Sequence, residues 1–363
     1  SPLFFFFSVA LRRDSSIPWD SPILPVADLG KFLVPLRGVF KEMGSSRPGL
    51  RGVRRPTHAG SWYEGDPDLL RDELQTMLGT EYAEGAIADP KLKAVISPHA
   101  GLRYSGSVAA GVFARLDAET VKQVVLIGPS HHAYLEGCAL PGEEVTKYRT
   151  PLGDLPLDLD TLAELRKTQE FSFLPMDVDE AEHSIEMQLP FLALLLQNPK
   201  RPVTLVPMLV GQVDAKSEAK YGRLLAPLLM KEGTVFVISS DFCHWGAQFG
   251  YTRVGSPGLA KTYRDGPHPD NARIEGLDRE GMALIEQQDA DGFRKYLHRE
   301  GNTICGRHPI LVLLETLAAT GGEKPVAVDF VKYAQSSAMP GMPPPRNASV
   351  SYACALCRPI EVS

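Results

Sequence analysis

Cysteine is scarce in this sequence, with five residues in a chain of 363. So few cysteines cannot form the disulfide framework of a secreted domain, and we therefore expect a reducing, cytoplasmic location. Long apolar runs are lacking too: none reaches the roughly 18 residues that a membrane-spanning helix requires. With 44% hydrophobic and 23% charged residues, the composition is globular and excludes wholesale disorder.

Basic residues are in short supply over most of the chain. The net charge is −6, yet residues 1–55 hold nine Lys and Arg against four Asp and Glu, whereas residues 56–363 hold 29 against 40. Nucleic-acid binding without sequence preference depends on clustered Lys and Arg. The acidic body is therefore not expected to bind nucleic acid.

Residues 1–55 form an amino-terminal extension that differs from the rest of the chain. Residues 3–11 (LFFFFSVAL) have the length of a signal-peptide core, but basic residues follow this run instead of preceding it. Three interpretations stay open: a truncated targeting segment, translated sequence upstream of a start at Met43, or an unusual extension. Under each of them we expect the segment to contribute no chemistry and to be dispensable for the fold.

From about Pro56 onward, apolar runs of strand length alternate with helical patterns. The strand-like runs are residues 92–97, 123–127, 203–210, 235–239, 326–331 and 350–356. The helical patterns are residues 68–78, 108–116, 159–167, 184–196, 216–230, 279–288 and 309–317. Pro190 predicts a break in the fourth of these helices. This alternation predicts one α/β domain over residues 56–363, with a central, mostly parallel or mixed sheet flanked by helices on both faces.

Three of the predicted strands end just before a histidine. His99 follows the first run in SPHAG, His131 and His132 follow the second in GPSHH, and Asp241 and His244 follow another in SSDFCHWG. In open parallel sheets, ligands bind outside the carboxyl ends of the strands. A single histidine there is more often structural, so it is the convergence of three strand ends that predicts a functional site.

Cys305 adds a sulfur atom to this set, in NTICGRHP just before the predicted helix from Pro309. A cysteine before a helix amino terminus can have a lowered pKa and act as a thiolate. Imidazole and thiolate ligands suit iron, copper or zinc and are poor ligands for magnesium or calcium. The lone CxxC of Cys354 and Cys357 has no second pair, and we interpret it as structural.

Two further stretches carry polar residues that are typical of a site. Glu182, His183 and Glu186 lie at the start of a predicted helix, where acidic residues also complement the helix dipole. The two glutamates are four residues apart, so they share a face and can hold a ligand histidine from behind. Arg149, in KYRTPLGD, is either a surface residue or a cation for an anionic ligand.

Nine ordered blocks of this sequence resemble the Memo family, named for mediator of ErbB2-driven cell motility. They are HAGSWY, SPHAG, GPSHH, YRTPLGDL, EHSIEMQLPFL, MLVG, SSDFCHWG, NTICGRHP and YAQSS. They extend from about His58 to Ala355, so the resemblance covers nearly the whole chain outside the extension. The family's fold resembles class III extradiol dioxygenases, with a mixed sheet between helices and one site at the strand ends. Residues 339–346 are an insertion outside the blocks.

Position by position, the resemblance implies a metal pocket of His99, His131 and Cys305. It places His244 where the dioxygenases have an acid/base, and it implicates Asp241 in copper-linked redox activity. The other residues that we expect to contact a ligand are Trp62, Tyr104, Arg149 and His183.

Three classes of function stay open on these residues. In the first, one Fe(II) or Cu ion per chain is held in the pocket, and His244 moves protons for an oxidoreductase acting on a small-molecule substrate. In the second, the pocket of a non-catalytic signalling adaptor in cell motility binds a phosphotyrosine-containing peptide or receptor tail, with Arg149 at the anion and Trp62 at the ring. The third is a zinc hydrolase with one open coordination position, and zinc is the least expected metal.

Overall fold

The computed structural model describes residues 52–196, 202–252, 269–321, 326–338 and 348–360. All of these residues belong to one compact unit, residues 48–363. The apolar run at residues 3–11 and the insertion at residues 339–346 lie outside the described residues. No helix in the described part of the chain is long and apolar enough to cross a membrane.

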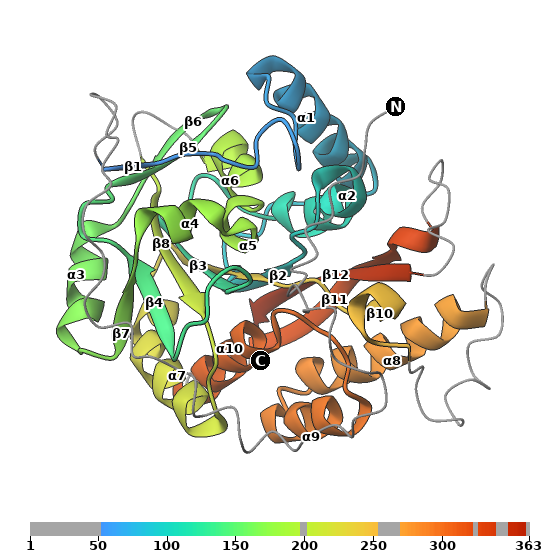
Figure 1. Ribbon diagram of the computed structural model, residues 1–363. Helices are drawn as coiled ribbons and strands as arrows, with labels where there is room; N and C mark the ends of the chain where they lie inside the picture. Colours follow the sequence, from blue (N-terminus) through green and yellow to red (C-terminus); the bar gives the residue numbers. More distant parts are fainter. Residues whose placement is uncertain (1–51, 197–201, 253–268, 322–325, 339–347, 361–363) are drawn as a thin grey trace, which may run out of the picture. The chain divides into compact units, whose positions relative to one another are not determined.

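A mixed sheet of nine strands, counted over the described residues, forms the centre of this unit (Figure 1). Its order is β10-β12-β2-β9-β3-β8-β4-β7, and β11 pairs with β12. The strands are β2 (Ala94–Ser97), β3 (Gln123–Pro129), β4 (Cys138–Pro141), β7 (Phe171–Leu174), β8 (Thr204–Val210), β9 (Thr234–Ser239), β10 (His244–Gly246), β11 (Val326–Gln335) and β12 (Ala348–Pro359). Neighbours β2, β9, β3 and β8 are parallel, while β12 and β4 run antiparallel to them. The predicted fold class is confirmed.

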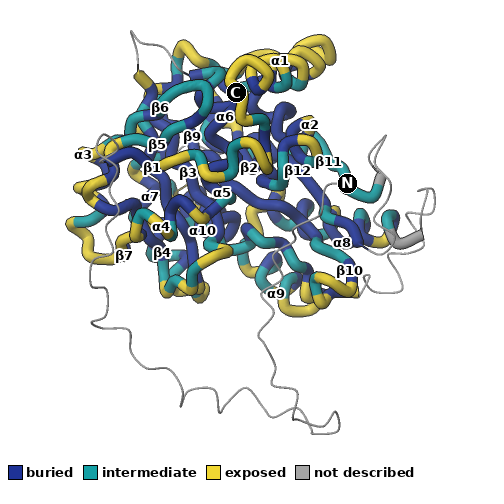
Figure 2. The backbone as a smooth tube through the Cα atoms, turned by 45° about the horizontal axis from the view of Figure 1, so that its top comes forward, coloured by how far each residue is buried: buried dark blue, intermediate teal, exposed yellow. Residues whose placement is uncertain are grey.

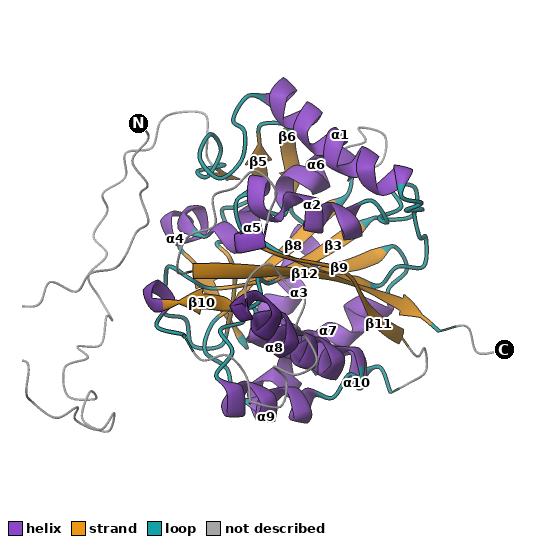
Figure 3. Ribbon diagram, turned by 90° about the vertical axis from the view of Figure 1, so that its right-hand side faces the viewer, coloured by secondary structure: helices purple, strands orange, loops and turns teal. Residues whose placement is uncertain are grey.

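Helices cover both faces of this sheet (Figure 3). One face carries α1 (Pro67–Ala83), α2 (Leu102–Phe113), α5 (His183–Glu186) and α6 (Leu189–Leu196). The other carries α7 (Ala215–Met230), α8 (Pro269–Glu286), α9 (Ala290–Glu300) and α10 (Arg307–Ala319). Two more helices, α3 (Leu159–Lys167) and α4 (Met176–Ala181), lie in the connections between strands. The predicted break at Pro190 is confirmed, because α5 ends at Glu186 and α6 begins at Leu189.

The central strands are buried along their whole length, as parallel strands covered on both faces must be. Every residue of β2, β3 and β9 is buried, and Figure 2 shows the sheet as a dark core beneath exposed helix surfaces. Aromatic packing extends this core between the helices of one face, where the rings of Phe113 and Phe191 stack with their centroids 4.8 Å apart.

A second, three-stranded sheet consists of β1 (Val53–Arg54), β5 (Lys147–Thr150) and β6 (Gly153–Pro156). Strand β1 pairs in parallel with β5, and its Arg54 side chain is fully buried. The packed body therefore includes residues that the sequence assigned to the extension. It begins at least three residues before the predicted start at Pro56.

Candidate metal centre at the strand ends

The three strand ends singled out in the sequence meet at one edge of the sheet. Strands β2, β9 and β3 are adjacent and parallel, so their carboxyl ends lie side by side. The loop after β2 carries His99, the loop after β3 carries His131, and the loop after β9 carries Asp241. This edge is where ligands bind in open α/β sheets.

His99, His131 and Cys305 form a group that can hold a metal ion, with one ligand atom of each within 4.8 Å of the others. The Cys305 Sγ lies 3.1 Å from the His99 Nε2 and accepts the backbone N–H of Asp241 at 3.3 Å. Gly306 allows the Cys305 loop to approach the β9 loop, because a Cβ there would lie only 2.3 Å from a side-chain atom of the serine at position 240. The structure thus brings together the three residues that the sequence assigned to a metal pocket.

A chain of buried hydrogen bonds fixes the tautomer of His99. The Ser239 hydroxyl donates its one proton to the Ser184 carbonyl at 2.6 Å and accepts from the Gln188 amide at 2.9 Å. The His99 Nδ1 lies 2.7 Å from the same hydroxyl and must therefore be the protonated ring nitrogen. Its Nε2, which faces Cys305, is left with a free lone pair.

A glutamate fixes His131 in a comparable way. The His131 backbone N–H donates to the Glu182 Oε2 at 2.6 Å, and its Nδ1 lies 2.9 Å from Oε1. Because an ionised carboxylate only accepts, Nδ1 carries a proton, and Nε2 can bind a metal once it has lost its own proton. Burial lowers the pKa of His131, but hydrogen bonds to Cys305 and Glu182 outweigh burial and raise it to about 10. The prediction that Glu182 holds a histidine is confirmed.

The thiol of Cys305 differs from the sequence prediction in its acidity. A position before a helix suggested a lowered pKa, whereas burial raises the pKa of Cys305 and the nearby His131 offsets this only in part. A bound metal ion would compensate the partly buried thiolate, since coordination deprotonates a thiol outright. Two imidazoles that are each held through Nδ1 and one such thiol fit a borderline or soft transition metal.

His244 lies close enough to this group to interact electrostatically with His99 and His131. Its Nδ1 is 2.9 Å from the Phe242 carbonyl and 3.2 Å from the Thr303 carbonyl. Carbonyls only accept, so Nδ1 is protonated and the free lone pair is on Nε2. Burial lowers the pKa of His244 to about 4, and the ring is therefore neutral near pH 7.

Asp241 joins two of the loops that form the site. Its Oδ1 accepts the backbone N–H of His99 at 2.8 Å, which ties the loop after β9 to the loop after β2. Its side chain is buried, and burial raises the pKa of Asp241 to about 7. The carboxyl group therefore acts on the loop that orients His99.

Asp278 on α8 joins a second pair of loops. It is fully buried, and its Oδ1 accepts the Cys243 backbone N–H at 3.2 Å and the Asn302 side-chain amide at 3.0 Å. Its Oδ2 accepts the Tyr333 hydroxyl at 2.9 Å. Asp278 thus connects the segment that carries His244 with the segment that carries the pocket cysteine, and no sequence pattern predicts this link.

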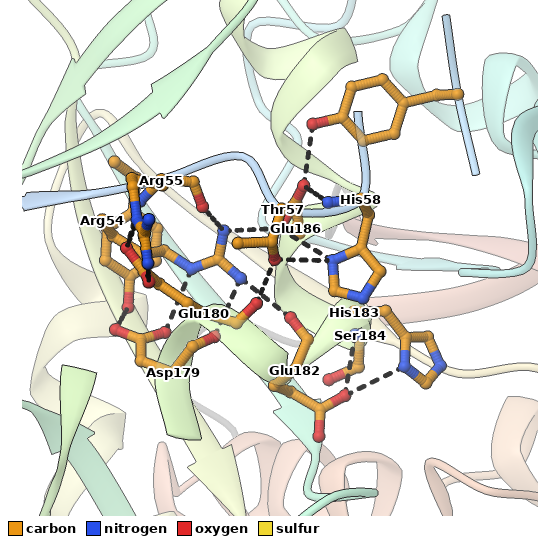
Figure 4. Close-up of polar contacts among 12 residues, drawn as sticks. Arg54, Arg55, Thr57, His58, Asp179, Glu180, Glu182, His183, Ser184 and Glu186 are labelled. Atoms are coloured by element: carbon orange, nitrogen blue, oxygen red, sulfur yellow. Dashed lines mark hydrogen bonds and ion pairs between the residues drawn. The ribbon is translucent and has the colours of Figure 1, made fainter. Parts of the chain in front are cut away.

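A second histidine–glutamate pair repeats the arrangement of the first (Figure 4). His58 donates its backbone N–H to the Glu186 Oε1 at 2.8 Å, and its Nδ1 lies 2.9 Å from Oε2. Glu186 also accepts from the Tyr63 hydroxyl at 2.9 Å and from the Arg54 guanidinium at 2.6 Å. Glu186 therefore also holds a histidine, but this is His58, which was not among the predicted metal ligands or site residues.

Arg54 is the buried cation that pairs with Glu186 (Figure 4). Besides Glu186, its guanidinium contacts the Asp179 Oδ1 at 3.2 Å. It also donates to the backbone carbonyls of Asp179 at 2.8 Å and Glu182 at 2.9 Å. A two-residue strand has no hydrophobic periodicity, so sequence reasoning missed this residue.

His183 lies at the centre of a cluster of rings beside the metal group. Its ring centroid lies 4.4 Å from that of His131, with the planes nearly parallel, and 4.5 Å from that of Trp62. Three more imidazoles lie within 6.0 Å of it: His99, His132 and His58. Trp62 is 38% exposed, so this cluster is open to solvent at the indole.

Tyr104 and Arg149 have other neighbours. Tyr104, on α2, lies beneath the Arg103 guanidinium, 4.7 Å from its ring centre. Arg149, on β5, forms a bidentate ion pair with Asp154 at 2.8 and 3.1 Å. Within the described ranges, neither has a hydrogen bond or ring contact with the histidine cluster. Asp154 therefore occupies the Arg149 guanidinium, which the sequence analysis considered as a cation for an anionic ligand.

Comparison with known proteins identifies the relatives of this chain. The family model described as Memo-like protein matches residues 54–356. Protein MEMO1 of Danio rerio is 41% identical over 304 residues, covering 83% of this chain and 95% of the relative. Protein MEMO1 of Homo sapiens is 38% identical, with the same two coverages. A MEMO1 family protein of Schizosaccharomyces pombe is 36% identical and covers 84% of this chain and 99% of its own.

One solved structure, of an uncharacterized Escherichia coli K12 protein, is also similar, with 16% identity and a TM-score of 0.36. It covers 77% of this chain and 91% of that one, and at this level of similarity it supports no inference. The family match and the identities over most of both chains are sufficient by themselves. The chain is a member of the Memo-like protein family.

Proposed function

We propose that the strand-end pocket binds one redox-active metal ion, iron or copper, through the Nε2 atoms of His99 and His131 and the thiolate of Cys305. The grouping of these three ligand atoms within 4.8 Å carries the proposal. Ser239 and Glu182 support it, because each holds the Nδ1 of one ligand histidine and leaves its Nε2 side to the metal. Imidazole and thiolate donors favour iron or copper over hard cations. Such an ion would supply one-electron chemistry or polarise a bound small molecule.

In an oxidoreductase of this kind, His244 is the proton acceptor. Its neutral ring, with the Nδ1 proton held by the carbonyls of Phe242 and Thr303, offers the Nε2 lone pair to a substrate proton. Asp241 acts indirectly, by holding the backbone of His99. The substrate would be a small molecule of the kind that dioxygenase-like enzymes oxidise. The reaction would take place in a pocket that is partly shielded from water.

A signalling adaptor that binds phosphotyrosine peptides is the second candidate, and one observation favours it. Trp62 is 38% exposed and stacks beside His183, so it can accept a tyrosine ring. The charges nearby are less suitable, because Arg149 is paired with Asp154 and the pocket histidines are backed by glutamates. A phosphate dianion would therefore lack the bidentate cation that usually holds it.

All five cysteines are free thiols in the structure, and one of them belongs to the proposed metal ligands. A pocket that depends on a reduced thiol works best in a reducing compartment. We therefore place the protein's activity in the cytoplasm.

Metal analysis of protein purified without chelators tests the main proposal. We expect close to one equivalent of iron or copper in the wild type and a loss of most of it in the double variant His99→Ala/Cys305→Ser. His244→Ala should keep the metal but lose turnover, because this ring lies beside the ligands. An unchanged metal content in the double variant would show that the ligands are other residues.

A further inference from the structure

We propose a second, outer cation site next to the first, formed by Glu182, His183 and the Nδ1 side of His131. One ligand atom of each residue lies within 4.8 Å of the other two. The His131 Nδ1 is 2.9 Å and the His183 Nδ1 is 3.5 Å from the same oxygen, Glu182 Oε1. Ligand atoms about 2.0 to 2.2 Å from a tetrahedral Zn²⁺ are separated by roughly 3.4 Å. The three side chains therefore need only small shifts to enclose an ion.

An unpaired nitrogen of His183 is the second observation that points to a ligand. The His183 Nδ1 is buried and has no hydrogen-bond partner among the residues described. Leaving such an atom unpaired costs free energy, which a bound ion would recover. The rings of Trp62 and His131 pack against the His183 ring. The His183 nitrogens can therefore reach a ligand only at the edge of the ring.

The charge on Glu182 supports a cation at this place. The Glu182 side chain is 1% exposed, and its partners in the described structure are imidazoles and the backbone N–H groups of His131 and Ser184. Glu186, four residues along, has the permanent cation Arg54. Within the described residues, the Glu182 carboxylate pairs with no Lys or Arg side chain. A buried carboxylate without a compensating charge is unfavourable, and an outer cation would restore the balance.

The imidazole of His131 would then join the two sites. Its Nε2 faces the inner ion, and its Nδ1 loses a proton to solvent when the outer ion displaces it from the hydrogen bond with Glu182. The outer donors are two nitrogens and one oxygen without sulfur, which suits Zn²⁺ or Cu²⁺ better than Cu(I). This site goes beyond the proposed function, which requires only the inner ion.

Equilibrium dialysis of the metal-free, full-length protein against Zn²⁺ tests this proposal. We expect two bound equivalents in the wild type, one in His183→Ala and one in Cys305→Ser. The matched control is His298→Ala, which changes an exposed histidine on α9 and should keep two equivalents. With Co²⁺ as the probe, thiolate-to-metal absorption should stop growing after one equivalent, because only the inner site contains sulfur.

Other stoichiometries decide between the two sites. A single wild-type equivalent that Cys305→Ser removes would contradict the outer site and leave the proposed function intact. A single equivalent that His183→Ala removes and Cys305→Ser retains would support the outer site and contradict the inner one. Two equivalents in His183→Ala would overturn the outer site. If that variant does not fold, the wild-type stoichiometry and His183→Gln, which keeps a polar side chain, decide the question.

Discussion

The two histidine–glutamate pairs on helix α5 have the same local geometry but different electrostatic surroundings. In each pair, one glutamate accepts both the backbone N–H and the Nδ1 proton of one histidine. Glu186, however, also pairs with Arg54, whereas the Glu182 side chain is surrounded by imidazoles. A carboxylate with a permanent cation stabilises the fold in any state of the pocket. A carboxylate balanced only by histidines is sensitive to what those histidines bind.

The largest effect should come from removing the permanent cation of the Glu186 pair. Arg54→Met leaves the buried Asp179 without its cation and Glu186 with His58 alone, which should cost about 3 to 5 kcal/mol of unfolding free energy. For a protein of this size, the melting temperature should fall by roughly 10 °C in a thermal scan. The control is Arg55→Met, because that guanidinium is 61% exposed in its pair with Glu180. Equal losses in the two variants would contradict a special role for the buried arginine.

Substitutions of the two glutamates should have different effects on metal affinity. Glu182→Gln weakens the support of His131 and should reduce affinity at the inner site about 10- to 100-fold. Glu186→Gln should reduce stability while leaving affinity within a few-fold of the wild type, because its histidine is not an inner ligand. Competition with a chelator of known affinity measures both variants. Similar affinities would mean that the two pairs do not differ in function.

Asp278 extends the comparison to a buried carboxylate whose hydrogen-bond donors are all neutral. Burial raises its pKa to about 6, above the unfolded value of about 3.9. Between these values the native state binds a proton that the unfolded state lacks, so stability falls as pH rises from about 4 to 6. The loss is about 2 to 3 kcal/mol. Asp278→Asn should remove this pH dependence, which urea unfolding of the metal-free protein at about pH 4 and pH 6 measures. If the unfolding free energy of the variant changes with pH as much as that of the wild type, the assignment to Asp278 is wrong.

The smallest effect should come from Arg149, whose ion pair with Asp154 is 40% exposed at the guanidinium. Exposed pairs contribute little, so Arg149→Ala should cost less than about 1 kcal/mol. It should leave metal content unchanged, because Arg149 belongs to the small sheet. A marked loss of peptide or anion binding in this variant would favour the adaptor function instead.

Elements with a clear apolar pattern could be predicted from the sequence, and most of the short ones could not. The helix at residues 159–167 and the strands near residues 123, 204 and 234 lie where apolar periodicity places them. Strands β4, β5, β6, β7 and β10 have three or four residues each, which is too short for a period to be recognised. Helix α9 was missed because its residues 290–300 are largely charged and only Phe293, Tyr296 and Glu300 are buried.

The site was predictable where a ligand follows a strand and not where it depends on distant partners. His99 and His131 follow β2 and β3, so topology alone brings them together. The pairing of His58 with Glu186 joins residues 128 positions apart and has no local signature. The raised pKa of Cys305 depends on its burial, which the position before α10 does not reveal.

Titration of the metal-free protein with Cu²⁺, followed by visible absorption, tests the central claim most directly. A thiolate bound to Cu²⁺ gives an intense charge-transfer band. We predict that this band appears in the wild type, saturates at one equivalent and persists in Cys138→Ser, which changes a buried cysteine on β4. The band should be absent in Cys305→Ser. A wild type without the band, or a band of equal strength in Cys305→Ser, would contradict a metal held by two imidazoles and this thiolate.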